Sequence, residues 1–276
     1  DVTDTIFVLA SAQNYIPFEG IFQMVPNDGP YLICSDITLH DNGNNDGFAD
    51  YGETVNMNIA FRNVGNQSAE NVHAVITTED PYVVIVDNAL DIPMLATSDE
   101  QNYANAFIFY VQPNVPAYHV ATFHITLNYN DETYEINKNV ALHAPELSIG
   151  QFVVDDEQLG NGNHKLDLGE DAHLVLDLHN LGNGATKDGM VYLYSVDQRI
   201  KLFRYPQEVE PIVADGSKNV RFRVRVNSSV TAPTCAELRV RFKVGEYDVE
   251  KIIPVKIGNM SEDWESGDFT TFNWSN

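Results

Sequence analysis

The sequence repeats itself at an offset of 117 residues, which restricts the chain to a fold that can be duplicated in tandem. Without gaps, Gly52-Glu53 aligns with Gly169-Glu170, and the motif N-x-G-N at 63–66 aligns with the same motif at 180–183. The apolar periodicity between these positions stays in phase. We therefore interpret the chain as two copies of one fold.

Short runs of alternating apolar residues occur throughout both copies. The clearest are Val55, Met57, Ile59, Phe61; Ala121, Phe123, Ile125, Leu127, Tyr129; Val220, Phe222, Val224, Val226; and Leu238, Val240, Phe242. A period of two indicates strands with one buried face. No segment has the pattern of a helix of ordinary length. Regularly spaced strands separated by Gly, Asn, Asp and Pro predict an all-β chain made of two tandem immunoglobulin-like antiparallel β-sandwiches.

The repeat sets the expected domain boundaries. The first sandwich is expected at 31–144 and the second at 145–258, joined at His143-Ala144-Pro145. Residues 1–30 predict two strands, which belong to the end of a preceding immunoglobulin-like domain or form an added hairpin, because two strands alone are not a stable domain. Residues 259–276 are acidic and aromatic, and we expect them to begin a further domain.

The charge of the chain excludes some classes of partner. With 40 acidic and 16 basic residues among 276, the formal net charge is −24. Such a chain repels phosphate backbones and anionic membrane surfaces, which argues against nucleic acid as a partner. No apolar run approaches the ~20 residues that a membrane helix needs, so we expect no membrane insertion.

The loop His40-DNGNNDGFADYGE-Thr54 concentrates side-chain oxygen between two predicted strands. Read from Asn42, it follows the calcium-loop pattern D-x-[DN]-x-[DN]-G-x5-E, with Asp41 able to serve in the first position. Calcium prefers six to eight carboxylate and carbonyl oxygens. The expected ligands are Asp41, Asn44, Asp46, the carbonyl of Phe48, Asp50 and Glu53. The alternative is a polar turn, since Asn, Asp and Gly favour turns.

The second copy of this loop departs from the pattern. It has two extra residues before the aligned portion, and Leu159, His164 and Lys165 lie within it. Lys165 could replace a cation with its own charge. A second calcium site would use Asp155, Asp156, Asn161, Asn163, Asp167 and Glu170. In both loops the expected role of calcium is structural, because no nucleophile or base lies nearby.

No constellation of catalytic residues is evident in the sequence. The eight histidines are scattered, and none is spaced with cysteine as in a metal site. Cys34 and Cys235 are flanked by apolar residues, which is more typical of core thiols than of a redox pair. The chain contains no G-x-S-x-G, P-loop or G-x-G-x-x-G motif. We therefore expect this chain not to be an enzyme.

Two rows of basic residues stand on the polar faces of neighbouring predicted strands: Arg221, Arg223, Arg225, and Arg239, Arg241, Lys243. One interpretation is a basic face for an acidic partner, such as a neighbouring acidic domain or an anionic glycan. The other is local pairing with Asp and Glu across strands. In an immunoglobulin-like topology the connection between these strands crosses from one sheet to the other, so the rows would lie on opposite faces.

Several motifs resemble modules of secreted bacterial proteins. The stretch DNGNNDGFADYGETV, followed by NVGN and NVHAVITT, resembles immunoglobulin-like modules that follow gingipain-type cysteine peptidase domains. The opening ASAQNYIPFEG is similar to the final strands of the immunoglobulin-like domain after that catalytic domain, and EDWESGDFTTFNW is similar to the start of a jelly-roll adhesin domain. The resemblance implies an extracellular or cell-surface location and a non-catalytic region of the parent peptidase.

Together these patterns predict a calcium-stiffened spacer or adhesion module of a larger secreted or cell-surface peptidase. Its expected partners are the neighbouring domains of the same polypeptide, and a host protein or glycan is a further candidate. The alternative function is an adhesin module that binds glycan or protein independently of any peptidase.

Overall fold

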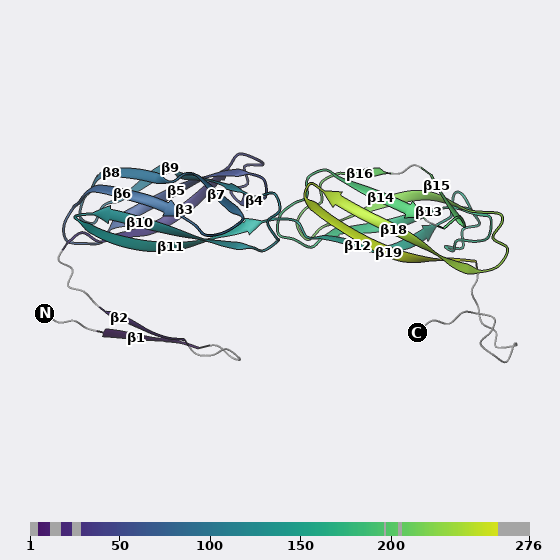
Figure 1. Cartoon of the computed structure of the whole chain (residues 1–276), viewed down its shortest axis with the longest axis horizontal. Coiled ribbons are helices and arrows are strands. Elements are labelled where there is room, and N and C mark those ends of the chain that lie inside the picture. The colour runs from purple at the N-terminus through teal and green to yellow at the C-terminus, as the bar shows by residue number, and fades with distance from the viewer. Residues whose placement is uncertain (1–4, 12–17, 24–28, 196, 204–205, 259–276) are drawn as a thin grey trace. The chain divides into compact units, whose positions relative to one another are not determined.

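The structure is a computed structural model that describes residues 5–11, 18–23, 29–195, 197–203 and 206–258, and all regular elements in these ranges are β-strands (Figure 1). The all-β prediction is confirmed. None of the described segments forms a helix long and apolar enough to cross a membrane.

The chain divides into two compact units. The first holds the described residues of Asp1–Ala49, Glu53–Val111 and Val120–Val140. The second holds those of Asp50–Gly52, Gln112–His119 and Ala141–Asn276.

The first region, residues 31–144, contains two larger sheets. One has the strand order β3-β5-β9-β7, with bounds Leu32–Asp41, Thr54–Asn63, Glu100–Val111 and Val83–Asp87. The other has the order β4-β11-β10-β6-β8, with bounds Ala49–Asp50, Glu132–His143, Val120–Tyr129, Ala69–Thr77 and Ala89–Leu95. In these sheets the pairs β3–β5, β5–β9, β7–β9, β6–β10 and β6–β8 are antiparallel. The fully buried side chains include Phe61, Phe107, Phe109 and Phe123, which come from strands of both sheets.

The second region also has two antiparallel sheets. One has the order β12-β13-β17-β15, with bounds Leu147–Asp155, Asp171–Asn180, Ser217–Val226 and Ile200–Phe203. The other has the order β16-β14-β18-β19, with bounds Gln207–Val209, Gly189–Ser195, Thr234–Val244 and Tyr247–Ile257. One hydrophobic core draws side chains from both sheets, among them Leu176, Phe222, Val240 and Phe242. Two sheets around one core fit a β-sandwich.

The alternating sequence pattern accounts for these strands. Along β17, Val220, Phe222, Val224 and Val226 are buried while the residues between them are exposed. Successive side chains of a strand point to opposite faces, so this alternation places one face in the core and the other in water. Burying a side chain such as Phe222 contributes roughly 1.5–3 kcal/mol.

The sequence repeat is visible in where strands begin. The bounds of β5 and β13, Thr54–Asn63 and Asp171–Asn180, are separated by the sequence offset at both ends. The strands β7 and β15 begin at Val83 and Ile200, and β9 and β17 begin at Glu100 and Ser217, again at that offset. The two four-stranded sheets that contain these pairs also share one strand order. The two copies therefore agree in structure as well as in sequence.

The N-terminal residues form the two strands expected there. β1 (Thr5–Ala10) pairs antiparallel with β2 (Phe18–Gln23). Phe7, Leu9 and Phe18 on this hairpin are exposed. The predicted further domain at 259–276 lies outside the described residues.

Candidate metal loops

The first acidic loop connects β3 to β5 and is organised around the buried carboxylate of Asp41. Asp41 Oδ1 accepts hydrogen bonds from the backbone N–H of Gly43 at 3.1 Å and of Asn45 at 2.7 Å. Asp41 Oδ2 accepts one from Gly47 N–H at 3.0 Å. Burial raises the pKa of Asp41, but these backbone hydrogen bonds outweigh it and leave the pKa below its ordinary value. The ionised carboxylate of Asp41 therefore fixes the conformation of the loop by binding three of its backbone N–H groups.

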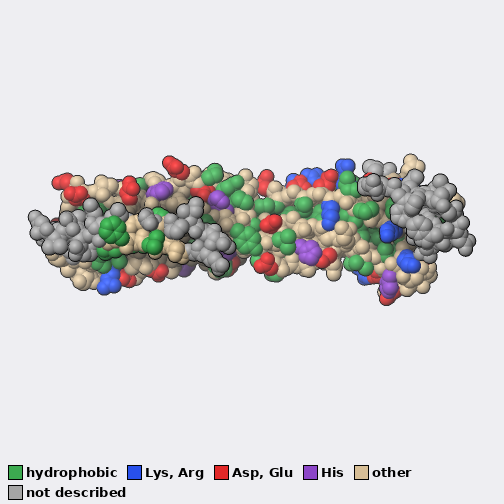
Figure 2. Space-filling view, turned by 90° about the horizontal axis from the view of Figure 1, so that it is seen from below, with side chains coloured by type: hydrophobic (Ala, Val, Ile, Leu, Met, Phe, Trp, Pro, Cys, Tyr) green, Lys and Arg blue, Asp and Glu red, His purple; other side chains and the backbone are tan. Residues whose placement is uncertain are grey.

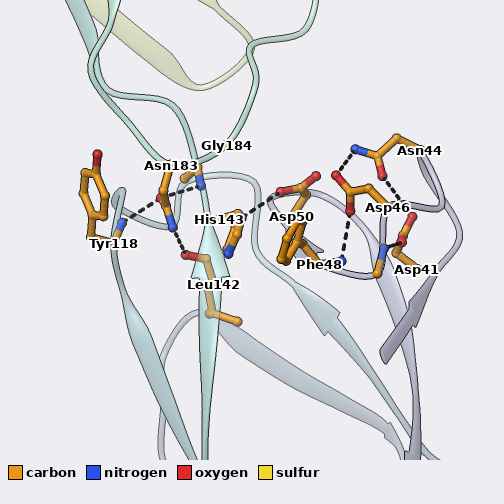
Figure 3. A network of polar contacts seen from close by, with 12 residues as sticks. Asp41, Asn44, Asp46, Phe48, Asp50, Tyr118, Leu142, His143, Asn183 and Gly184 are labelled. Carbon is orange, nitrogen blue, oxygen red and sulfur yellow. Dashed lines mark hydrogen bonds and ion pairs between the residues drawn. The ribbon is translucent and has the colours of Figure 1, made fainter. Parts of the chain in front are cut away.

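The outer part of this loop is exposed and closes on itself (Figure 3). Asp46 Oδ1 accepts the backbone N–H of Phe48 at 2.9 Å, and Asp46 Oδ2 accepts Asn44 Nδ2–H at 2.9 Å. Asn44 Oδ1 in turn accepts the backbone N–H of Asp46 at 3.0 Å. Asn45 and Gly47 have positive φ angles of 57° and 83°, which fits the preference of Asn and Gly for left-handed turn positions.

The inner part of the loop holds two further buried carboxylates. Asp50 Oδ1 lies 4.0 Å from His143 Nδ1. Glu53 is packed against Gly43, where a Cβ atom added to the glycine would stand 1.7 Å from Glu53 Oε1. Asn42 Oδ1 accepts the backbone N–H of Thr54 at 2.9 Å and ties the beginning of the loop to its end.

The second loop, between β12 and β13, repeats this design around Asp156. Asp156 is buried, and its carboxylate accepts the backbone N–H groups of Asn163 and His164, each at 3.0 Å. Burial raises the pKa of Asp156, and the hydrogen bonds from His164 and Asn163 outweigh burial and lower the pKa. Gly47 and His164, whose backbone N–H groups bind the two carboxylates, are separated by the repeat offset. Asp41 and Asp156 are separated by two residues fewer, because the second loop contains two extra residues. Asp156 is thus the counterpart of Asp41.

The remaining polar residues of the second loop bind one another. Asn161 Nδ2 and Asn163 Nδ2 each donate to Asp167 Oδ2 at 2.8 Å. The two oxygens of Glu170 accept the backbone N–H groups of Asn161 and Asp167, at 3.0 and 2.8 Å. A Cβ atom at Gly160 would stand 2.0 Å from Glu170 Oε1, which repeats the relation between Gly43 and Glu53.

The predicted ligands do not all face their loops. Asp155 forms an ion pair with Arg221 of β17. Lys165 donates its backbone N–H to Asn163 Oδ1 at 2.9 Å. The side chain of Phe48, whose carbonyl was the predicted ligand, is half exposed.

The loops have the donor chemistry of a calcium site without a converged cage. Carboxylate and amide oxygens of the kind that calcium prefers lie within each loop, and a glycine leaves room for the glutamate beside them. Among the described residues, however, no group of three or more His, Cys, Asp or Glu side chains comes together to hold a metal ion. Asp46 and Asp167 would have to exchange their hydrogen bonds from Asn44, Phe48, Asn161 and Asn163 for the ion.

The aligned N-x-G-N motifs have a structural role that the sequence interpretation did not assign. Asn63 Oδ1 accepts the N–H groups of Tyr31 and Gly65, and its Nδ2 donates to the carbonyls of Gln67 and Leu95. Asn63 is fully buried. One amide therefore satisfies four backbone groups where the first strand begins. The signal in the sequence was the repetition of the motif at the fixed offset.

Asn180 does the same in the second copy. Its Oδ1 accepts the N–H groups of Glu146 and Gly182 at 3.1 Å each, and its Nδ2 donates to the carbonyls of Gly184 and Ile212. Asn183, the last residue of the motif, accepts the N–H of Tyr118 at 2.9 Å and donates Nδ2–H to the Leu142 carbonyl at 3.1 Å within the second compact unit (Figure 3).

The two rows of basic residues lie on different sheets, because β17 and β18 belong to different sheets. Local pairing with acidic residues is observed in both. Arg221 pairs with Asp155, Arg223 with Asp171 at 2.7 Å, and Arg225 with Asp171. On the other sheet Arg239 pairs with Glu250 at 3.4 Å and Arg241 with Asp248.

The two cysteines differ from each other. Cys34 is buried, as expected for a core thiol, and burial raises its pKa. Cys235 is exposed, so the expectation of a core thiol is wrong there. The reason is the alternation along β18, in which Ala236 and Leu238 point into the core and Cys235 points outward. No disulfide joins the two.

Comparisons with known proteins identify no family for this chain. No protein-family model matches it, and no curated protein matches it. Among solved structures, it is similar to a red sea bream transglutaminase, with 11% sequence identity, a TM-score of 0.31, and coverage of 81% of this chain but only 31% of the transglutaminase. It is also similar to a protein of unknown function from Porphyromonas gingivalis W83, with 12% identity, a TM-score of 0.26, and coverage of 83% of this chain and 99% of that one.

Proposed function

We propose that the chain is a non-catalytic module of two tandem immunoglobulin-like β-sandwiches that acts as a spacer or adhesion segment of a larger secreted or cell-surface protein. The observation that carries this proposal is the repeated use of buried polar residues to brace loops. Asp41 and Asp156 hold the loops between the first two strands of each copy, and Asn63 and Asn180 hold the segments where the first strands begin. Such use of buried polar groups suits a segment that keeps a fixed shape.

The immunoglobulin-like assignment is supported by strand number and pairing. Each copy has a four-stranded sheet of the same order and a second sheet. The described residues form nine strands in the first copy and eight in the second, and immunoglobulin-like sandwiches have seven to nine strands. The resemblance of the DNGNNDGFADYGETV stretch to modules beside gingipain-type cysteine peptidases makes such a peptidase our candidate for the parent protein. We assign no catalytic role to this chain, and its neighbours in the polypeptide are the proposed partners.

Calcium is the proposed stiffening ion, first at the loop of 41–53 and then at that of 155–170. Asp41, Asn44, Asp46, Asp50 and Glu53 would hold it in the first loop. In the second loop it would be held by Asp156, Asn161, Asn163, Asp167 and Glu170. Asp155 is not included, because it forms an ion pair with Arg221. Bound calcium would neutralise carboxylates that otherwise repel one another, and it would link both ends of the loop.

Thermal unfolding tests the calcium proposal. The chain is melted in EDTA, in ~1 mM calcium and in ~1 mM magnesium, beside the variant Asp46→Ala/Glu53→Ala. With a dissociation constant of about 10 μM, a hundredfold excess of calcium stabilises one site by roughly 2.7 kcal/mol. We expect calcium, but not magnesium, to raise the melting temperature. The rise should be smaller in the variant, because the variant removes ligands of the first loop only.

The matched control is Asp87→Ala/Glu135→Ala, which removes the same charge from two exposed positions outside the loops. It should keep the full calcium effect. Equal melting temperatures in calcium and EDTA would show that DNGNNDGFADYGE is a polar turn held by its own hydrogen bonds. Turnover of peptide substrates by this chain alone would contradict the non-catalytic assignment.

A further inference from the structure

A basic groove lies on the outer face of the second region, between the loop of 158–170 and the strands β17 and β15. Its volume is about 840 Å³, and Lys201, Arg223, Arg225, Gln158, Asn227 and Ser228 contribute to its walls. The chain's basic residues are concentrated in this region, since only Arg62 and Lys138 precede residue 144. In Figure 2 most of the blue side chains accordingly lie over the part of the chain that holds β12–β19.

The strand register brings the cations together. Asp171 of β13 stands opposite Arg225 of β17, which stands opposite Lys201 of the edge strand β15. One carboxylate and two cations therefore form a row across three strands. In the adjacent position Arg223 stands opposite Phe203. Like charges directly opposite each other on neighbouring strands destabilise a sheet, so the pair of Arg225 and Lys201 carries a cost.

Phe203 organises the cationic groups. Lys201 Nζ lies 5.0 Å from the centre of its ring, and the guanidinium carbons of Arg223 and Arg225 lie at 5.3 and 5.8 Å. These distances are within the range of cation–π attraction. The ring therefore holds three cations at one place, which limits the entropy that a ligand would have to remove from long side chains.

The acidic residues of the groove leave part of this positive charge uncompensated. Asp171 accepts hydrogen bonds from Nη2 of Arg223 and from Nε and Nη2 of Arg225, so Nη1 of both arginines can serve a second acceptor. Lys201 forms no ion pair with the described residues, and Glu170 is the second carboxylate in the wall. Three cations thus face two carboxylates. On the opposite sheet, by contrast, Arg239 and Arg241 each have a carboxylate of their own.

We propose that this groove binds an acidic polysaccharide through the carboxylate or sulfate groups of its sugars. Guanidinium groups bind such oxyanions with paired N–H donors. The amides of Gln158 and Asn227 and the hydroxyl of Ser228 offer neutral hydrogen-bonding partners for sugar hydroxyls beside the cations. A polysaccharide alternates charged groups with hydroxyls, which matches one cationic cluster flanked by neutral polar groups. An acidic peptide would instead favour a continuous row of cations.

Binding of the full chain to two acidic polysaccharides tests the proposal. Polygalacturonate carries carboxylates, dextran sulfate carries sulfates, and neutral dextran is the blank. We expect the native chain to bind at least one of the acidic polymers, and their relative affinities identify the preferred oxyanion. Lys201→Glu should weaken binding at least tenfold, because it reverses the one charge of the cluster that forms no ion pair with the described residues. Arg223→Ala should weaken it about fivefold.

The control is Lys256→Glu, which makes the same charge reversal at an exposed position of β19 on the other sheet. It should change the affinity less than twofold. Lys201→Glu should also raise the melting temperature without ligand, because it replaces the like-charge pair with an opposite-charge pair, and this separates lost binding from lost folding. Absence of binding by the native chain, or equal weakening by Lys256→Glu, would overturn the proposal. So would equally tight binding of poly-L-glutamate, which would assign the groove to acidic peptides.

Discussion

At the scale of single residues, the pKa values of buried groups in this chain depend on the balance between burial and hydrogen bonding. Asp41 stays ionised although it is buried, because three backbone N–H groups point at its carboxylate. Tyr129 shows the opposite case. It is 3% exposed, its ring stacks on Tyr134 at 4.8 Å, and its hydroxyl accepts the N–H of Leu32 at 3.4 Å. Burial, which the Leu32 hydrogen bond only partly offsets, raises the pKa of Tyr129 to about 12.

This shift predicts a dependence of stability on alkaline pH. The pKa of a tyrosine in an unfolded chain is about 10, so the contribution of Tyr129 is complete below that pH and is lost as the pH rises towards 12. The loss amounts to about 2 kcal/mol. Denaturant unfolding at pH 9 and at pH 11.5 measures it. Tyr129→Phe should lose less stability between the two pH values than the native chain does.

The control for this measurement is Tyr194→Phe, which removes a tyrosine hydroxyl from an exposed position. It should lose as much stability as the native chain. An identical loss in Tyr129→Phe would show that ionisation of Tyr129 is not coupled to folding.

At the scale of elements, each acidic loop depends on a glycine that lies against a glutamate. Gly43 faces Glu53, and Gly160 faces Glu170. Neither glycine has a positive φ angle, so the need for glycine there is steric and does not come from backbone strain. The two loops differ in sequence but share this contact, which makes it the most direct link between the repeat and the loop conformation.

Substituting Gly43 by alanine should therefore displace Glu53. We expect a loss of about 1 kcal/mol of stability, because the added Cβ atom would overlap Glu53 Oε1 and the buried carboxylate must move. The double variant Gly43→Ala/Glu53→Ala should lose less than the sum of the two single variants. Denaturant unfolding of the three variants measures this coupling.

Gly29→Ala is the control, because no atom lies within 4 Å of a Cβ added at Gly29. It should stay within about 0.5 kcal/mol of the native chain. Additive effects at Gly43 and Glu53 would contradict the steric account of the loop.

At the scale of the whole molecule, the chain divides into two compact units that each bury their own hydrophobic side chains. Phe107, Phe109 and Phe123 are buried in the first unit, while Phe222 and Phe242 belong to the core of the second. Stability is therefore expected to vary between the units, and local changes in a core should act on the unit that contains it.

Phe222→Ala tests this expectation. Removing a fully buried phenylalanine costs about 3–5 kcal/mol, and the loss should fall on the second unit. Native-state hydrogen exchange should accelerate in β13 and β17 and stay unchanged in β5 and β9. The converse variant, Phe107→Ala, should show the reverse pattern. Equal acceleration in both sets of strands by either variant would show that the chain unfolds as one cooperative body.

The sequence by itself determined the elements and their repetition. Alternation along Val220–Val226 predicts a strand with a buried face because neighbouring side chains of a strand point to opposite sides, which is a local property. The offset between the two N-x-G-N motifs predicts the duplication for the same reason, since equal local sequences form equal local structures. The position of the two acidic loops between strands was also evident.

Only the tertiary structure decided which charged and polar groups of these elements pair with one another. The sequence does not say that Asp156, two residues out of register, takes the place of Asp41, because this depends on which backbone N–H groups the folded loop presents. The ion pair of Asp155 with Arg221 and the register that places Lys201 opposite Arg225 are of the same kind. Each depends on the register between strands far apart in the chain, and that register is set by packing the whole core rather than by any local pattern.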